Sequence, residues 1–520
     1  MNKQNTATNS LATAQTYIRR RMYGWHRTIG TIVCIPVIFW TLSGLMHPFM
    51  AHWFKPEIAR QFVIPKPVDQ AQISLSLQEV LTQNSIATLQ NFRIVSFAGQ
   101  TYYQVKQKAG EPLRYFDTQS GQELPDGEQK HAEYLARYFL DDAQSPLKSI
   151  TLQTEFDGQY KFVNRLLPVW KLSFDRPDRM DVYVETSSDR LATFNPTSRK
   201  AFLWVFDNFH NWSFLEAIAN NWLRITVMIA FLSIIILAAV SGLVIYGFMW
   251  SKFKAPANGD KTGFLRRYHR QIGLATALVT LTFAFSGAYH ATRKYSPNRL
   301  PEMVYTPEIK TADLRMASTA LPLDWERLHN LSLIQIRKTP YFQAFYKATE
   351  DQPAETQYYQ ALNGTVLENG NQVYAEYLVQ YFMAKLNTAN AADIDCCEMS
   401  QSLKGSDFAN ASLLETKPIA AFDNREYGFI FKRLPVVKFA YDTPDSDTFF
   451  VETSSGHLAA HIRNADRREG LSFAIFHKFF LMDWAGKNVR DGVMMLSALG
   501  VLVVNLMGML LWWGKPKRKR

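Results

Sequence analysis

The stretches WHRTIG (25–30) and YHRQIG (268–273) each open a long hydrophobic run, and they lie 243 positions apart. The same two runs end in SGLMHPF (43–49) and SGAYHAT (286–292), which are again 243 positions apart. A third pair of histidines, 267 positions apart, precedes two further hydrophobic runs. The three pairs are His26 with His269, His47 with His290, and His210 with His477. Histidines at the ends of membrane spans are costly to keep there, so they indicate a functional site.

Four hydrophobic runs are long enough to cross a bilayer, which takes about 17–25 residues. They are Ile29–His47, Ile225–Met249, Ile272–His290 and Val493–Trp513. Basic residues precede the first run, separate the second from the third, and end the chain as GKPKRKR. The positive-inside rule places these flanks in the cytoplasm, so both large polar regions are expected on the outer side. The net charge of +11 is therefore interpreted as a topology signal, and no nucleic-acid partner is expected.

These patterns predict a polytopic α-helical membrane protein with four transmembrane helices and two periplasmic α+β domains. The expected order is a disordered cytoplasmic tail (1–16), transmembrane helix 1 (17–54), a first periplasmic domain (55–200), a periplasmic lead-in with transmembrane helix 2 (201–252), a cytoplasmic loop (253–265), transmembrane helix 3 (266–292), a second periplasmic domain (293–470), and a lead-in with transmembrane helix 4 and a basic cytoplasmic tail (471–520). The first run lacks a small-residue cleavage site, so it is interpreted as an uncleaved anchor.

The chain also shows an internal duplication. RYFDTQSGQELPDG (114–127) resembles QYYQALNGTVLENG (357–370) at an offset of 243, and VYVETSS (182–188) resembles FFVETSS (449–455) at an offset of 267. Each half is therefore expected to be one unit of span, outer domain and span. Such parallel repeats imply a pseudo-twofold axis along the membrane normal. The difference of 24 between the offsets marks an insertion at about residues 384–426 of the second half.

The insertion contains two adjacent cysteines, Cys396 and Cys397, whereas Cys34 lies within the first run. An oxidising periplasm favours disulfides, but a bond between neighbouring cysteines closes a strained ring. A vicinal disulfide, an intermolecular bond and two free thiols all remain open.

Each of the four span-end histidines has a glycine about one helical turn toward the bilayer centre. The pairs are His26 with Gly30, His269 with Gly273, His47 with Gly44, and His290 with Gly287. Residues three or four positions apart share a helix face, so each pair offers a flat slot in which a porphyrin can lie. The alternative is that these glycines allow close helix packing.

The histidines therefore predict axial ligands of haem iron. Copper or zinc would suit clustered ligands better, and without C-x-x-C-H the haem is expected to be b-type. His26 and His47 are 21 residues apart, or about 31 Å along a helix, so the ligands form two layers. His26 with His269 is the expected inner pair. Four outer histidines remain, enough for one or two further haems, and their pairing stays open: His47, His210, His290 and His477.

Arginines next to the inner pair are candidates for holding haem propionates. Arg27 and Arg270 directly follow His26 and His269, although contact with lipid phosphates explains them equally well. Arg224 is a weaker candidate because its counterpart at an offset of 267 is Asp491. No catalytic residue is expected beyond the haem ligands. No dinucleotide-binding loop is present, so a quinol or a redox protein is the expected electron donor.

The H-R-x-x-G openings, the S-G-x-x-H span ends and the F-H-x-x segments resemble the PepSY-associated transmembrane family. More closely, the chain resembles the di-haem inner-membrane ferrisiderophore reductases of Gram-negative bacteria. This resemblance implies two b-type haems, periplasmic PepSY-like domains, a bacterial inner membrane, and reduction of iron carried by a siderophore. The alternative is a non-enzymatic receptor or assembly module that binds peptide or protein partners, with the duplicated VETSS strands as binding edges.

Overall fold

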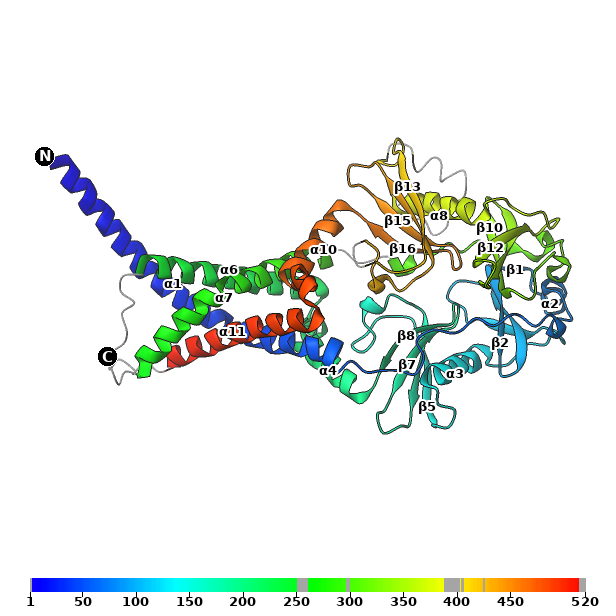
Figure 1. The fold of residues 1–520 in the computed structure, drawn as a ribbon, viewed down its shortest axis with the longest axis horizontal. Coiled ribbons are helices and arrows are strands. Elements are labelled where there is room, and N and C mark those ends of the chain that lie inside the picture. Colours follow the sequence, from blue (N-terminus) through cyan, green and yellow to red (C-terminus); the bar gives the residue numbers. More distant parts are fainter. Residues whose placement is uncertain are drawn as a thin grey trace. The chain divides into compact units, whose positions relative to one another are not determined.

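The computed structural model describes residues 2–249, 261–295, 300–387, 403, 406–423 and 426–513. The chain divides into a helical unit, residues 1–56, 198–297 and 465–520, and a sheet unit, residues 57–197 and 298–464 (Figure 1). Part of the predicted insertion, including Cys396 and Cys397, lies outside the described residues. Cys34, within the described part, is a free thiol.

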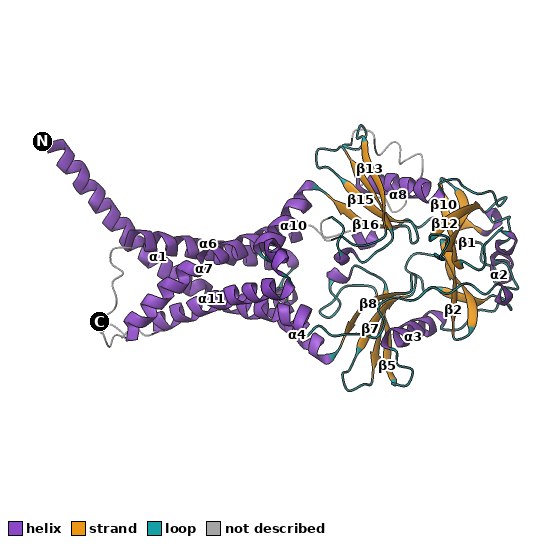
Figure 2. Cartoon of the chain, in the orientation of Figure 1, coloured by secondary structure: helices purple, strands orange, loops and turns teal. Residues whose placement is uncertain are grey.

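Four long helices form the helical unit (Figures 1 and 2). They are α1 (Asn2–Pro48), α6 (Asn221–Met249), α7 (Lys261–Thr292) and α11 (Lys487–Trp513). Each is long and apolar enough to cross a membrane, which confirms the four predicted spans. Aliphatic side chains from all four helices pack together between the two layers of histidines: Val33, Val37, Leu232, Ile235, Ala284 and Val501.

The first helix begins earlier than predicted. Residues 2–16, expected as a disordered tail, are the first turns of α1. The stretch from Asn2 to Tyr23 contains neither glycine nor proline, and those are the residues that most disfavour a helix. A polar composition alone therefore does not end the helix.

Short helices precede the second and fourth spans and position the third pair of histidines. They are α4 (Thr197–Phe209) and α5 (Phe214–Ile218) before α6, and α10 (Asn464–Phe476) and the 3₁₀ helix η10 (Phe480–Ala485) before α11. His210 follows α4 directly and His477 follows α10 directly. The backbone N–H groups of these two histidines donate to Phe206 O and Phe473 O, at 2.9 and 3.0 Å. Both histidines are therefore held by the last turn of the preceding helix.

The sheet unit is organised around a six-stranded sheet with the order β12-β11-β10-β2-β3-β4 (Figure 2). Its strands are β2 (Asn91–Phe97), β3 (Gln100–Lys106), β4 (Arg114–Asp117), β10 (Leu328–Ile336), β11 (Thr339–Tyr346) and β12 (Glu355–Gln360). The short helix α2 (Leu77–Gln83) contributes Leu77, Val80 and Leu81 to its core. Three strands come from each half of the chain, so the two predicted α+β regions share one sheet.

The two halves meet where β2 runs antiparallel to β10, with Arg93 opposite Ser332. Two asparagine side chains extend this contact in the same way on either side. Asn330 Oδ1 accepts from the Ile94 N–H at 3.2 Å, and Asn91 Oδ1 accepts from the Leu333 N–H at 3.1 Å. The side-chain amides thus accept from backbone N–H groups that would pair with backbone carbonyls if β2 and β10 were joined over a longer stretch.

Each half adds a four-stranded antiparallel sheet covered by one helix. The first half has β5 (Leu147–Gln153), β6 (Val169–Phe174), β7 (Asp181–Glu185) and β8 (Arg190–Asn195), with α3 (Gly127–Leu140). The second half has β13 (Leu413–Ile419), β14 (Val436–Tyr441), β15 (Thr448–Glu452) and β16 (His457–Ile462), with α8 (Gly370–Asn387). A two-stranded sheet joins β1 (Thr88–Leu89) to β9 (Ile309–Lys310).

The VETSS stretches do not form sheet edges. They begin in β7 and β15, and each of these strands is paired with a neighbour on both sides. All five residues of each strand are buried. The expectation that these strands are binding edges is therefore wrong, because an incoming peptide needs unpaired backbone groups.

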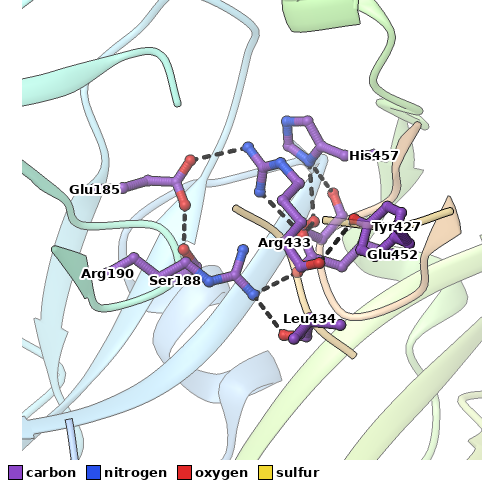
Figure 3. A network of polar contacts seen from close by, with 9 residues as sticks. Glu185, Ser188, Arg190, Tyr427, Arg433, Leu434, Glu452 and His457 are labelled. Atoms are coloured by element: carbon purple, nitrogen blue, oxygen red, sulfur yellow. Dashed lines mark hydrogen bonds and ion pairs between the residues drawn. The ribbon is translucent and has the colours of Figure 1, made fainter. Parts of the chain in front are cut away.

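A buried network of charged side chains connects the ends of β7 and β15 (Figure 3). Arg433 donates to Glu185 Oε1 at 3.0 Å and to Glu452 Oε2 at 2.9 Å. Arg190 donates to Glu452 and, at 3.0 Å, to Leu434 O. Although burial opposes ionisation, Arg190 and Arg433 lower the pKa of Glu452 to about 2. Two carboxylates and two guanidinium groups thus balance one another inside the sheet unit.

Candidate functional site

The rings of the predicted inner histidines lie close together in the helical unit. The ring centroids of His26 on α1 and His269 on α7 are 6.4 Å apart, with an interplanar angle of 61°. His26 Nδ1 donates to Ala238 O at 3.0 Å and lies 2.9 Å from Ser241 Oγ, while His269 Nδ1 donates to Val504 O at 3.0 Å. A carbonyl partner fixes the proton on Nδ1 and leaves the Nε2 lone pair for a metal.

The outer layer contains a second pair with the same spacing. The ring centroids of His210 and His477 are 6.3 Å apart, with an interplanar angle of 86°. Their Nδ1 atoms lie 3.1 Å from Ser43 Oγ and 3.2 Å from Ser286 Oγ. Both serine hydroxyls donate to carbonyls of their own helices, at 2.6 and 2.7 Å. Each Oγ therefore accepts the Nδ1 proton, and Nε2 again keeps its lone pair.

Burial favours the neutral form of these outer imidazoles, the form that binds a metal. Desolvation, followed by the charge of Lys478, lowers the pKa of His210 to about 3. Desolvation and the neighbouring His210 lower the pKa of His477 well below its ordinary value. Both rings are therefore uncharged at neutral pH, with a proton on Nδ1 only.

The spacing of both pairs suits one metal ion between two imidazoles. With metal–nitrogen bonds of about 2 Å, two opposed rings have centroids about 6 Å apart. Among the described residues, no group of three or more His, Cys, Asp or Glu side chains is placed to hold a metal. Zinc and copper sites usually take three or four protein ligands. A pair of imidazoles fits a metal whose other ligands belong to a macrocycle, as in haem.

The four predicted glycines lie in different surroundings. A Cβ built at Gly30 meets nothing within 4 Å, and one at Gly44 lies 4.0 Å from His210 Cε1. By contrast, Cβ atoms at Gly273 and Gly287 would touch Val504 and Leu232, at 3.9 and 3.6 Å. Gly30 and Gly44 thus suit a flat ligand beside histidine, whereas the other two allow helices to pack closely.

Two further glycines lie directly against the inner histidines, and they were not among the predicted site residues. A Cβ at Gly242 of α6 would be 3.2 Å from His26 Cε1, and one at Gly508 of α11 would be 3.4 Å from His269 Cε1. Both positions are tight for any side chain. The sequence does contain a signal for them: Gly242 and Gly508 are 266 positions apart, and so are Ala238 and Val504, the carbonyl partners of the two histidines.

The separation of 266 corrects the repeat assignment of Arg224. Its counterpart is Arg490 and not Asp491, because one residue is lost between the outer histidines and the last span. Arg224 donates to Asn211 O at 2.9 Å and to Asn221 Oδ1 at 2.6 Å. Arg490 pairs with Asp491 at 3.1 Å. Both guanidinium groups are already engaged by the chain itself, so neither is a good propionate partner.

Arg27 and Arg270 follow the inner pair on α1 and α7, as the sequence requires. Arg27 is exposed and Arg270 is half-buried. The exposure of Arg27 suits a lipid phosphate at least as well as a propionate.

The two remaining outer histidines have charged partners. Both ring nitrogens of His47 lie 3.3 Å from Lys478 Nζ, whereas His290 Nδ1 lies 2.6 Å from Glu469 Oε1. Burial lowers the pKa of Lys478 to about 8, so it stays largely cationic at neutral pH. Among the four predicted outer ligands, the structure thus places His210 with His477 at metal spacing and gives His47 and His290 other contacts.

Four candidate membrane spans and a sheet-rich unit define a membrane protein, and its helical unit contains two close pairs of imidazoles. The family model described as the PepSY-associated TM region matches residues 104–515, more than half of the chain. The chain therefore belongs to this family, as its histidine motifs predicted. A search of curated proteins returns no match.

Proposed function

We propose that this protein is a haem-b reductase of the bacterial inner membrane that passes electrons across the bilayer to a periplasmic ferric siderophore. The observation that carries the proposal is the pair of ring separations, 6.4 Å for His26 with His269 and 6.3 Å for His210 with His477. Each pair would supply two imidazoles to a single metal, one pair in each predicted layer. Two haems are therefore proposed.

The chain's own residues hold, orient and shield the two sites. His26 and His269 supply Nε2 to the inner site, and backbone carbonyls hold their Nδ1 protons. His210 and His477 do the same in the outer site, with Ser43 and Ser286 as partners. Haem bound in this way supplies one-electron transfer between the ferric and ferrous states. The aliphatic core between the layers excludes water from the path.

The proposed orientation follows from charge. Basic flanks are cytoplasmic under the positive-inside rule, so the sheet unit is periplasmic and the inner pair receives electrons first, from a quinol or a redox protein. Iron would leave the siderophore after reduction because hard oxygen ligands hold Fe(II) less tightly than Fe(III).

We also propose that the two halves arose by duplication. Buried contacts recur at equivalent places in the sheet unit: Gln104 Nε2 donates to the Tyr115 hydroxyl at 2.6 Å, and Gln343 Nε2 donates to the Tyr358 hydroxyl at 2.7 Å. The matched asparagines at the β2–β10 contact support the same origin.

The test is the visible spectrum of the purified protein. We expect a b-type haem spectrum whose reduced form is oxidised by a ferric siderophore under anaerobic conditions. A folded protein that is colourless and takes up no added haem would overturn the proposal and favour a receptor or assembly module that binds peptides or proteins.

A further inference from the structure

Lys478 is a partly buried cation beside the outer histidines. It directly follows His477, and its Nζ lies 3.3 Å from both nitrogens of His47. Within the described part of the chain it forms no ion pair. Asp491, whose charge acts on Lys478, is already bound by His52 at 2.9 Å and by Arg490 at 3.1 Å.

Withdrawing a cation from water is unfavourable unless an anion compensates it. A neutral imidazole accepts a hydrogen bond from Lys478 but brings no negative charge. A bound anion beside Lys478 would therefore compensate its charge.

The two halves of the chain differ in the charged residues beside their outer histidines. Lys478 corresponds to Asn211 in the first half, and Glu469 corresponds to Phe202, both at an offset of 267. The equivalent histidines thus face opposite charges, since His47 contacts Lys478 and His290 contacts Glu469. A carboxylate ligand would be attracted to Lys478 and repelled by Glu469.

We propose that Lys478 and His47 form a carboxylate-binding site beside the His210–His477 pair, and that a propionate of the outer haem fills it. The proposal rests on the proposed function. It makes His47 a positioning residue and not an axial ligand. The same chemistry would also accept a carboxylate of an organic ferric chelate, so the experiment has to separate the two sources.

The experiment compares three variants of the full-length holoprotein. Lys478→Asn introduces the residue of the other half, Lys478→Arg keeps the charge, and Lys487→Asn removes a charge from an exposed position nearby. Haem content and the midpoint potential of the outer haem are measured by spectroelectrochemical titration without any chelate. Binding of ferric citrate to each variant is measured separately.

We expect the outer haem of Lys478→Asn to become harder to reduce, because an uncompensated propionate stabilises the ferric state. A tenfold change in the ratio of oxidised to reduced haem would appear as about 59 mV for a one-electron couple. Lys478→Arg and Lys487→Asn should keep the potential of the unmodified protein. In protein reconstituted with haem dimethyl ester, which lacks free propionates, Lys478→Asn should cause little further shift.

The possible results are distinct. An unchanged potential in Lys478→Asn, combined with weaker binding of ferric citrate only, would assign the site to the chelate and overturn the propionate. An unchanged midpoint potential together with unchanged binding of ferric citrate would show that Lys478 and His47 form no carboxylate-binding site. Absence of haem from the unmodified protein would instead refute the proposed function.

Discussion

Two of the places where this protein buries charged side chains differ in whether other side chains of the chain supply the opposite charge. In the sheet unit, Arg433 and Arg190 neutralise Glu185 and Glu452 without any help (Figure 3). In the helical unit, Lys478 contacts the neutral ring of His47 and lies 5.9 Å from the centroid of the Phe473 ring, and it forms no ion pair with any described residue. A network that balances its own charges serves the fold, whereas one that lacks a partner indicates a ligand. Substitutions in both places test that distinction.

The largest effect is expected at the paired histidines. Under the proposed function, His210→Ala or His477→Ala should remove the outer haem and abolish reduction of the ferric chelate, because one of the two proposed ligands is lost. His26→Ala should leave the outer haem in place and oxidisable by chelate, yet block its reduction by the physiological donor. His47→Ala should retain both haems. Haem content and single-turnover oxidation measure these outcomes, and loss of the outer haem in His47→Ala would show that the pairing is different.

A large loss of stability is expected at Arg433. Arg433→Leu introduces the residue found at its counterpart Leu166. It leaves buried Glu185 without its cation and Glu452 with Arg190 alone, at a cost of about 3–5 kcal/mol. The control is Arg60→Leu, which removes a largely exposed ion pair with Asp141 and should cost at most about 1 kcal/mol. Hydrogen exchange at β7 and β15 in the full-length protein measures both. Equal effects would mean that the network contributes no more than a surface pair.

The same network predicts a pH dependence. The pKa of Glu452 is lowered to about 2, against about 4.3 for a glutamate in an unfolded chain. Its contribution is therefore complete above the unfolded value and is lost as the pH falls from about 4 toward 2. The stability difference between the unmodified protein and Arg433→Leu should shrink over this interval in hydrogen-exchange measurements. A constant difference would show that Glu452 is protonated already at neutral pH.

A moderate effect is expected at the glycine beside His26. In Gly242→Ala the new methyl group would lie 3.2 Å from His26 Cε1, and such overpacking costs about 1–3 kcal/mol. Retention of the inner haem should fall while the outer haem is unaffected. Gly247→Ala is the matched control on the same helix, because nothing lies within 4 Å of its Cβ. Equal haem retention in the two variants would remove Gly242 from the site.

The smallest effect is expected at the serines. Ser43→Ala deletes the acceptor of the His210 Nδ1 proton, at a cost of about 1 kcal/mol. Ser241→Ala should cost less, because His26 still donates to Ala238 O at 3.0 Å. The midpoint potentials of the two haems, followed separately, give the comparison. A larger effect of Ser241→Ala would contradict the view that backbone carbonyls orient the inner pair.

Much of the helical unit could be read from the sequence because it depends on local periodicity. The four spans and the facing of His26 and His269 follow from hydrophobic length and from repeat symmetry. The pairing of His210 with His477 could not be read, since it depends on how the turns after α4 and α10 place two side chains. Ser43 and Ser286 lay in the S-G-x-x-H motif, but spacing alone does not show which distant histidine they contact.

Long-range pairing explains the misses in the sheet unit. The VETSS stretches carry the continuous burial of an interior strand, and such runs do not alternate as a half-exposed edge would. The sheet shared by both halves rests on contacts between residues 239 positions apart, such as Arg93 with Ser332. No local pattern encodes such a pairing.

The β2–β10 contact also sets an order of assembly. Strand β2 is synthesised early, but its partner β10 follows only after α6 and α7 have been made. The first three strands of the sheet must therefore wait, with one edge open, until two further membrane helices have emerged. Contacts of such high sequence separation form slowly, and an open edge invites pairing with other chains. A chain cut short between α7 and β10 would thus expose the open edge of β2 and be prone to aggregate, so completion of the second half protects the first.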